Sequence, residues 1–274
     1  MNTSFGNNAP DLKLKHTLRI AYFYPELLNL YGDNGNIEIL VSRAKHYGFD
    51  ASVVNVSINT NTPMADLQST NFVFMGGGPD ASQKIMYEDL KNNKAAFLKD
   101  YIESEKCGLF ICGAYQLLGN YYKASDGFIL DGLGVFDLHT EHFGSSKPRC
   151  IGNTMATLSD EISKDPVFPS TPFNAALVGF ENHGGRTYLS DRLKPFAYVV
   201  KGHGNNSEDL GEGLLYKNSI GTYFHGPLLS KNPHLADYLI FKALGISVEE
   251  ILHLPKIDDS IVFSAHTASK NLKQ

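Results

Sequence analysis

Residues 106–119 read KCGLFICGAYQLLG, and this stretch predicts a strand, a sharp turn and the start of a helix. The apolar run at 109–111 lies between a glycine and Cys112, as in a short, fully buried strand. The next two residues, glycine and alanine, have almost no side chain, so the backbone can turn tightly and approach a ligand there. Apolar residues at helical spacing follow. The fold should therefore be organised around the turn at Cys112.

Cys112 occupies the junction between this strand and this helix. The partial positive charge of a helix N-terminus favours a thiolate. The layout is that of a nucleophile elbow with sulfur in place of a hydroxyl, although the outer glycines of G-x-S-x-G are here Phe110 and Ala114. A buried structural cysteine after a core strand would give the same pattern. The stretch alone leaves both interpretations open.

Three further strands, at 18–24, 51–58 and 71–75, are predicted before this one. The intervening segments have helical periodicity, and the first helix closes at Gly48. Strands that alternate with helices predict an α/β fold with a mostly parallel sheet flanked by helices. Ligands of such sheets bind at the carboxyl ends of the strands.

Two other features fall at predicted strand ends. Gly76–Gly78 follow the strand at 71–75, and their backbone N–H groups could face a ligand, although a flexible turn is the simpler explanation. His225 follows a strand at 220–224, which pairs with 213–216 in a predicted β-hairpin. A thiol, a set of backbone amides and a histidine should therefore share one rim of the sheet.

The whole chain divides into three parts. Residues 1–15 are expected to be a loose leader, and 16–245 a single domain whose second half adds extra strands and long loops. Residues 246–274 are expected to be a C-terminal tail, loosely held from Pro255 onward. A helix at 232–244 precedes that tail.

Composition excludes several classes of protein. The net charge of −5, with scattered basic residues, gives no support to nucleic-acid binding. Three cysteines argue against a disulfide framework, and neither Cys107 with Cys112 nor His139 with His142 has a second pair to complete a metal site. No run of about 18 apolar residues or signal pattern is present, so we expect a cytoplasmic protein without membrane insertion.

The chemistry that joins the three strand-end features is acyl transfer by a thiol. A cysteine thiol is mostly protonated at neutral pH, so it needs a base, and His225 could supply one and later protonate a leaving amine. The N–H groups of Gly78 and Gly113 could hold the tetrahedral oxyanion. No acid stands two residues after His225, because that position is Pro227.

Five ordered segments resemble the CobB/CobQ-like class I glutamine amidotransferases, and within that family the subunits that serve lipid II amidation. The segments are LYGDNGNI (30–37), GGGPD (76–80), ICGAYQ (111–116), GFENHGGRT (179–187) and GTYFHGP (221–227). The resemblance covers roughly residues 18–244. It implies the flavodoxin-like sheet of those amidotransferases, with extra strands in the C-terminal half.

The resemblance also implies a glutaminase. Cys112 would form a glutamyl thioester and release ammonia, His225 would match the family's catalytic histidine, and Arg149 would hold the α-carboxylate of L-glutamine, unless it is a solvated loop residue. A MurT-like, Mur-ligase-family partner would activate the acceptor carboxylate of lipid II with ATP and Mg²⁺. This chain has no P-loop motif and would need no cofactor of its own. A cobyrinate-like acceptor and a non-catalytic scaffold are the alternatives.

The sequence departs from the family pattern at two positions. Ala114 stands where the family usually has a second glycine after the cysteine, which would be strained if that residue had a positive φ. The His-x-Glu of many class I amidotransferases is also absent. From the missing acid we infer, as a hypothesis, that the partner subunit supplies the carboxylate that orients His225.

Overall fold

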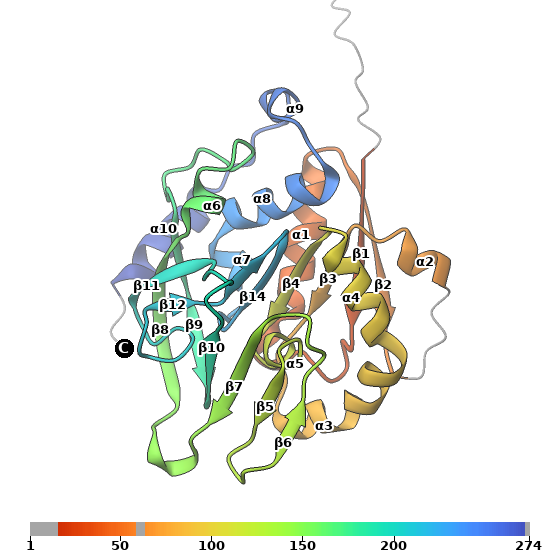
Figure 1. Cartoon of the computed structure of the whole chain (residues 1–274). Coiled ribbons are helices and arrows are strands. Elements are labelled where there is room, and N and C mark those ends of the chain that lie inside the picture. Colours follow the sequence, from red (N-terminus) through yellow and green to blue (C-terminus); the bar gives the residue numbers. More distant parts are fainter. Residues whose placement is uncertain (1–15, 59–63, 272–274) are drawn as a thin grey trace, which may run out of the picture.

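A computed structural model describes residues 16–58 and 64–271 (Figure 1). The leader predicted at 1–15 lies outside the described residues. The central sheet has six strands in the order β13-β14-β4-β3-β1-β2, and all but β13 run parallel. Its strands are β1 (Thr17–Phe23), β2 (Asp50–Val56), β3 (Phe72–Met75), β4 (Cys107–Ile111), β13 (Leu214–Tyr216) and β14 (Ser219–Thr222). The predicted parallel α/β sheet is confirmed.

Burial explains why the central strands are nearly all apolar. Every residue of β3 and β4 is buried, as expected for strands covered on both faces, and β2 is more exposed because it is the edge strand. The β13–β14 hairpin is antiparallel, as predicted, and β14 adds to β4 in parallel register. That pairing brings the end of β14, with His225 beyond it, next to the end of β4.

Helices cover the two faces of this sheet (Figure 1). The first, α1 (Asn34–His46), ends before Gly48, whose φ of +83° fits the predicted closing glycine. The segment expected to be helical at 87–105 begins earlier, at Asp80, because the extended Pro79 can begin a helix. It consists of α3 (Asp80–Asp89), a π-helical turn at Leu90–Lys94, and α4 (Ala95–Glu103). The other helices and helical turns before residue 245 are η1 (Leu30–Gly32), α2 (Met64–Gln68), α5 (Gly113–Leu117), η3 (Gly144–Ser146), α6 (Asp160–Ser163), α7 (Leu228–Lys231) and α8 (Pro233–Leu244).

The second half of the chain builds two four-stranded sheets beside the central one (Figure 1). One has the order β10-β7-β5-β6, and the other has the order β12-β11-β8-β9. Their strands are β5 (Tyr121–Lys123), β6 (Ile129–Asp131), β7 (Leu138–His142), β8 (Cys150–Leu158), β9 (Ala176–His183), β10 (Gly185–Leu189), β11 (Ala197–Lys201) and β12 (Gly211–Glu212). The extra strands predicted for this half are therefore present.

The C-terminal segment differs from the loosely held tail that we predicted. Residues 246–271 contain α9 (Val248–Leu252), begun by a Ser247–Glu250 capping box, and α10 (Ser260–Lys270). His266 of α10 is fully buried against Phe173, with ring centroids 4.1 Å apart. Asp259 binds Arg43 of α1 at 2.7 Å. These contacts join residues distant in sequence, so local periodicity carried no sign of them.

Within residues 16–58 and 64–271, no helix is both long enough and apolar enough to cross a membrane.

Candidate active site

Cys112 lies on a strained turn between β4 and α5. Its backbone has φ +50° and ψ −105°, a conformation rare for a residue with a side chain. Its N–H donates to the carbonyl of Thr222 at the end of β14, 2.8 Å away, and its side chain is 8% exposed. Ala114, by contrast, lies inside α5 and has no positive φ, so alanine is accommodated where the family usually has glycine.

His225 is held beside this turn by its backbone. It forms a short antiparallel bridge with Phe180 of β9, donating at 2.7 Å and accepting at 3.3 Å. The side chain is 1% exposed, and its Nε2 atom makes no hydrogen bond within the described residues. The sulfur of Cys112 is close enough to contribute to the raised pKa of the His225 ring. The structure thus brings together the two residues that the sequence selected as nucleophile and base.

Asp33 supplies the carboxylate that the sequence analysis did not find. Its Oδ1 atom lies 3.1 Å from Nδ1 of His225, and both side chains are completely buried. Its Oδ2 atom accepts the N–H of Gly77 at 2.8 Å. The ring nitrogen for which we expected a partner subunit's carboxylate therefore already has one from its own chain, and that hypothesis is corrected.

The charge state of His225 follows from these neighbours. Burial by itself disfavours a charged imidazole, but the hydrogen bond that Nδ1 donates to Asp33 and the proximity of the Cys112 sulfur outweigh it. Together they raise the pKa of His225 to about 10. The ring is therefore an imidazolium at neutral pH.

The glycine loop after β3 packs directly against this pair. A Cβ atom at Gly77 would lie 2.7 Å from Cε1 of His225 and 3.1 Å from Cβ of Cys112, so only glycine fits. The Gly77 carbonyl accepts the N–H of Leu30 at 3.0 Å. Because N–H and C=O point in opposite directions in a trans peptide, the N–H of Gly78 faces away from Leu30, and it has no acceptor among the described residues.

A pocket of about 420 Å³ opens above Cys112. Arg149 and Asp80 both line it, and so does Gly78. The Arg149 guanidinium is fixed by Asn182, whose side-chain oxygen accepts from Nε at 3.2 Å and from Nη2 at 2.9 Å. The sequence-predicted Arg149 thus shares one pocket with the candidate nucleophile.

Tyr31 packs against the ring of His225. Its ring meets the imidazole edge-on with centroids 4.9 Å apart, and its hydroxyl accepts a hydrogen bond from Asn182. Tyr31 has φ +59°, so the loop after β1 is locally strained where it reaches the site. Asn182 therefore connects Tyr31 with Arg149 through its hydrogen bonds to both side chains.

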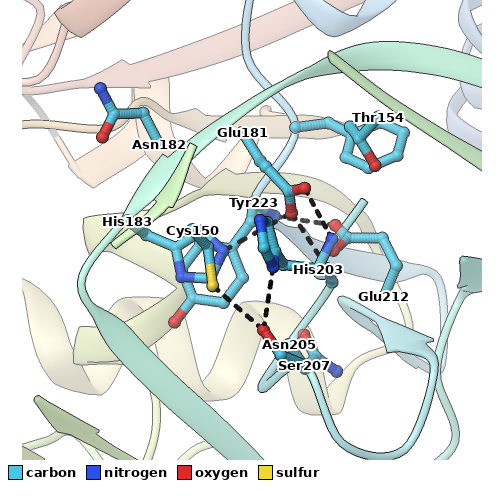
Figure 2. Close-up of polar contacts among 12 residues, drawn as sticks. Cys150, Thr154, Glu181, Asn182, His183, His203, Asn205, Ser207, Glu212 and Tyr223 are labelled. Atoms are coloured by element: carbon cyan, nitrogen blue, oxygen red, sulfur yellow. Dashed lines mark hydrogen bonds and ion pairs between the residues drawn. The ribbon is translucent and has the colours of Figure 1, made fainter. Parts of the chain in front are cut away.

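The GFENHGGRT segment contributes residues to a buried cluster of polar contacts (Figure 2). Glu181 is fully buried and accepts the backbone N–H groups of His203 at 2.7 Å and Gly204 at 3.0 Å. His183 stacks on Tyr223 with centroids 3.7 Å apart, and burial lowers its pKa. In Figure 2 Asn182 points away from this cluster, as strand alternation requires. Glu181 and His183 thus hold loops in place.

His139 and His142, the pair considered as metal ligands, both contact other side chains or backbone groups. His139 stacks between Tyr121 and Tyr188, with centroids 5.0 and 5.4 Å away. His142 lines the pocket, and its Nδ1 accepts the N–H of Gly144 at 2.9 Å. Within residues 16–58 and 64–271, no three histidine, cysteine, aspartate or glutamate side chains are grouped to hold a metal ion.

These groups form the constellation needed for acyl transfer through a thiol. A sulfur on a strained turn faces a charged imidazole, which a buried carboxylate orients. The N–H of Gly78, which has no acceptor among the described residues, lies in the same pocket. A site of this kind defines a cysteine-dependent amide-cleaving enzyme.

Comparison with known proteins narrows this class. Residues 19–233 match the model of the CobB/CobQ-like glutamine amidotransferase domain, and the chain belongs to that family. The GatD subunit of the glutamine-hydrolysing lipid II isoglutaminyl synthase of Streptococcus pneumoniae is 38% identical over 92% of this chain and 90% of its own. The GatD of Staphylococcus aureus is 40% identical over 83% of this chain and 85% of its own.

Solved structures show the same fold at low sequence identity. PurLQS of Thermotoga maritima superimposes with a TM-score of 0.55 and 16% identity, covering 83% of this chain and 97% of that one. A glutamine amidotransferase of the same organism has a TM-score of 0.52 and 15% identity, covering 93% and 94%. The predicted amidotransferase-like fold is confirmed.

Sequence reasoning missed Asp33, Tyr31 and Asp80. The loop that carries the first two follows β1 and so reaches the same rim of the sheet, but the pairing of Asp33 with His225 depends on contacts between residues distant in sequence. Asp80 follows the glycine loop after Pro79, and no role was predicted for its side chain. Asn182 was quoted within a motif without a role.

Proposed function

We propose that this chain is the glutaminase subunit of a lipid II isoglutaminyl synthase. It hydrolyses L-glutamine and delivers ammonia to a ligase subunit, which amidates the α-carboxyl of D-glutamate in the stem peptide. The observation that carries the proposal is the buried Cys112–His225–Asp33 arrangement below a pocket that contains Arg149. The similarity to two GatD subunits along most of their length supports lipid II as the acceptor of the ammonia.

In the first half of the reaction, the sulfur of Cys112 attacks the side-chain carbonyl carbon of glutamine. The carbonyl π electrons move to oxygen and form a tetrahedral oxyanion. His225 then gives its proton to the amide nitrogen as the carbon–nitrogen bond breaks, so ammonia leaves and a glutamyl thioester remains. His225, now neutral, takes a proton from water, which attacks the thioester and releases glutamate and the thiolate.

Two backbone amides are proposed as the oxyanion hole. The N–H of Gly78 has no acceptor in the part of the chain that the structure describes, and its orientation is fixed through the Gly77 carbonyl. The N–H of Gly113 belongs to the first residue of α5, where a helix has no internal acceptor for it. Donors of this kind are worth roughly 10²- to 10³-fold in rate each.

Arg149 is proposed to bind the α-carboxylate of glutamine. Its Nε and Nη2 atoms are engaged by Asn182, which fixes the plane of the guanidinium at the pocket wall. A guanidinium recognises a carboxylate through paired, charge-assisted hydrogen bonds. This contact would select free glutamine over a glutaminyl side chain within a protein.

The ligase half of the reaction is assigned to a partner. Hydrolysis of glutamine releases ammonia but supplies no energy for forming a carbon–nitrogen bond at a carboxylate, so we infer a MurT-like, Mur-ligase-family subunit. That subunit would use ATP and Mg²⁺ to activate the acceptor, whereas the glutaminase chain needs no cofactor. The complex would act in the cytoplasm, where ATP and soluble glutamine are both available.

Glutamine-dependent amidation of lipid II by the reconstituted two-subunit complex tests this function. Cys112→Ser is expected to abolish amidation with glutamine while leaving amidation with ammonium chloride intact. Failure of ammonium to restore activity would show that Cys112 acts beyond ammonia production. Unchanged glutamine-dependent amidation in Cys112→Ser would favour the scaffold alternative.

A cobyrinate-like carboxylate, the alternative acceptor, has one observation in its favour. The probable cobyric acid synthase of Methanosphaera stadtmanae is 30% identical over 167 residues, but the match covers only 32% of that protein. A cobyrinate-like acceptor is tested by substituting it for lipid II in the same assay. Amidation of that acceptor alone would replace the lipid II assignment.

A further inference from the structure

The pocket above Cys112 is lined by one acidic and one basic side chain. Asp80 and Arg149 are the aspartate and the arginine among its described lining residues, which include no glutamate or lysine. The two histidines at the pocket, His142 and His183, both have a lowered pKa, in each case chiefly because burial disfavours the charged ring. The wall away from the sulfur therefore presents one negative and one positive charge.

Asp80 lies where a ligand can reach it. It is the first residue of α3, is exposed, and follows the Gly76–Gly78 loop after Pro79. It takes part in none of the salt bridges found among residues 16–58 and 64–271. Its charge nevertheless acts on two residues of the pocket, since it opposes the lowering of the His142 pKa by Arg149 and helps to raise the pKa of Tyr122.

The first turn of α3 is fixed in position by a buried side chain. Gln83 is 3% exposed, and its Nε2 donates to the carbonyl of Gly78 at 3.1 Å. Its Oε1 has no partner within the described residues, although Gln83 lines the pocket. Asp80, one turn earlier on the same helix, is therefore presented by a rigid element beside the glycine loop. An unpaired buried acceptor in the same wall is a further sign of a polar ligand.

We propose that Asp80 binds the α-ammonium group of glutamine and thereby determines specificity for the free amino acid. This inference rests on the proposed glutaminase function. Glutamine has a carboxamide at one end and a zwitterionic α-carbon at the other. With the carboxamide over Cys112, the Arg149 guanidinium can take the carboxylate and the Asp80 carboxylate the ammonium. Each charge of the ligand then meets its opposite.

A purely structural role for Asp80 has different consequences. An acidic residue in the first turn of a helix is stabilised by the helix dipole, a contribution of about 0.3–1 kcal/mol. In that case its loss would lower the stability of the protein and leave ligand discrimination unchanged. The two roles are therefore separated by comparing ligands that differ only in the α-amino group.

Calorimetric binding to the full chain with Cys112→Ala, which cannot turn over, makes this comparison. The ligands are L-glutamine and glutaramate, the same molecule without the α-amino group. The Cys112→Ala parent is expected to bind glutamine roughly 10- to 100-fold more tightly than glutaramate, as a charged hydrogen bond implies. Adding Asp80→Asn should lower the affinity for glutamine to that for glutaramate, and Asp80→Glu should restore part of the difference.

Asp160→Asn serves as the matched control, because Asp160 is the exposed first residue of α6 and does not line the pocket. It should leave both affinities unchanged. An equal loss of affinity for both ligands in Asp80→Asn, or an undiminished preference for glutamine over glutaramate, would overturn the assignment of Asp80. Absence of glutamine binding in the Cys112→Ala parent would instead contradict the proposed function itself. Thermal melts of each variant establish that the protein is folded.

Discussion

The Nδ1 atom of His225 lies 3.1 Å from Oδ1 of Asp33, across 192 residues of sequence and with both side chains excluded from solvent. The second oxygen of the same carboxylate accepts the N–H of Gly77. One side chain thus orients the candidate base and also fixes the glycine loop beside the nucleophile. Removing its charge should therefore affect chemistry more than binding.

We expect Asp33→Asn to lower kcat/KM for glutamine hydrolysis by up to about 10⁴-fold, the loss seen in kcat when the orienting acid of a triad becomes an amide. The hydrogen bond that His225 donates to Asp33 contributes to the raised pKa of His225, about 10, so its weakening should lower that pKa. Activity that depends on the imidazolium would then be lost at lower pH. The alkaline limb of the kcat/KM profile should shift to lower pH in the variant. A partner carboxylate acting in its place would leave both readouts unchanged.

Gly77→Ala tests the packing between the glycine loop and the catalytic pair. The added Cβ would lie 2.7 Å from His225 and 3.1 Å from Cys112, and it would displace the imidazole from the sulfur. We expect glutaminase activity to fall at least 100-fold, as a displacement of about 1 Å can cost that much.

Gly48→Ala provides the contrast to this variant. Gly48 has φ +83° and open space around the position of a Cβ, so alanine there is strained but touches nothing. It should lower the melting temperature and preserve activity. Equal loss of activity in both variants would indicate general destabilisation.

Much of this arrangement could be predicted from local sequence, because the strands of the central sheet are short apolar runs bounded by turn residues. Cys112, Gly78 and His225 each follow a predicted strand of this sheet. Because parallel strands place their carboxyl ends together, the three residues were expected at one rim. Asp33 was not found, because its pairing with His225 depends on the path of the loop after β1. That path is set by Leu30 and Gly77, which are distant in sequence.

The C-terminal segment was mispredicted for a related reason. Residues 246–271 have weak periodicity, and their position depends on single contacts with distant parts of the chain. One of these is the bidentate pairing of Arg43 with Asp237 of α8, at 2.6 and 2.7 Å, together with Asp259 before α10. A buried ion pair between residues 194 positions apart leaves no pattern in the local sequence.

Arg43→Met should test how strongly this pairing holds the C-terminal helices. Both Arg43 and Asp237 are more than 90% buried, so removing the guanidinium leaves a carboxylate without its charge partner. We expect a loss of about 3–5 kcal/mol in the free energy of unfolding, measured by urea denaturation. The double variant Arg43→Met/Asp237→Asn should recover part of it. A loss below about 1 kcal/mol would mean that water reaches the pair.

Glu212 provides a prediction about pH. It is fully buried, and its Oε1 accepts the hydroxyl of Thr222 at 2.6 Å and the N–H of Tyr223 at 2.9 Å. Its Oε2 has no partner within the described residues. Burial raises the pKa of Glu212 to about 8, against the opposing effect of the Thr222 hydrogen bond. The folded protein therefore keeps this carboxyl neutral at pH 7.

The direction in which stability changes with pH follows from the protonation of Glu212 in the folded and the unfolded chain. Below about pH 4.5 the group is protonated in both the folded and the unfolded chain, and it contributes no pH dependence. Between 4.5 and 8 only the unfolded chain releases the proton, so stability falls as pH rises, by a total of roughly 3–5 kcal/mol. Glu212→Gln keeps an acceptor for Thr222 and Tyr223 and cannot ionise. Its stability relative to the unsubstituted protein, measured by urea unfolding, should therefore be lowest at pH 5 and increase steadily to pH 8.5. Glu208→Gln, at an exposed position, should show no such increase, and a flat difference for Glu212→Gln would mean that the buried carboxyl is ionised throughout.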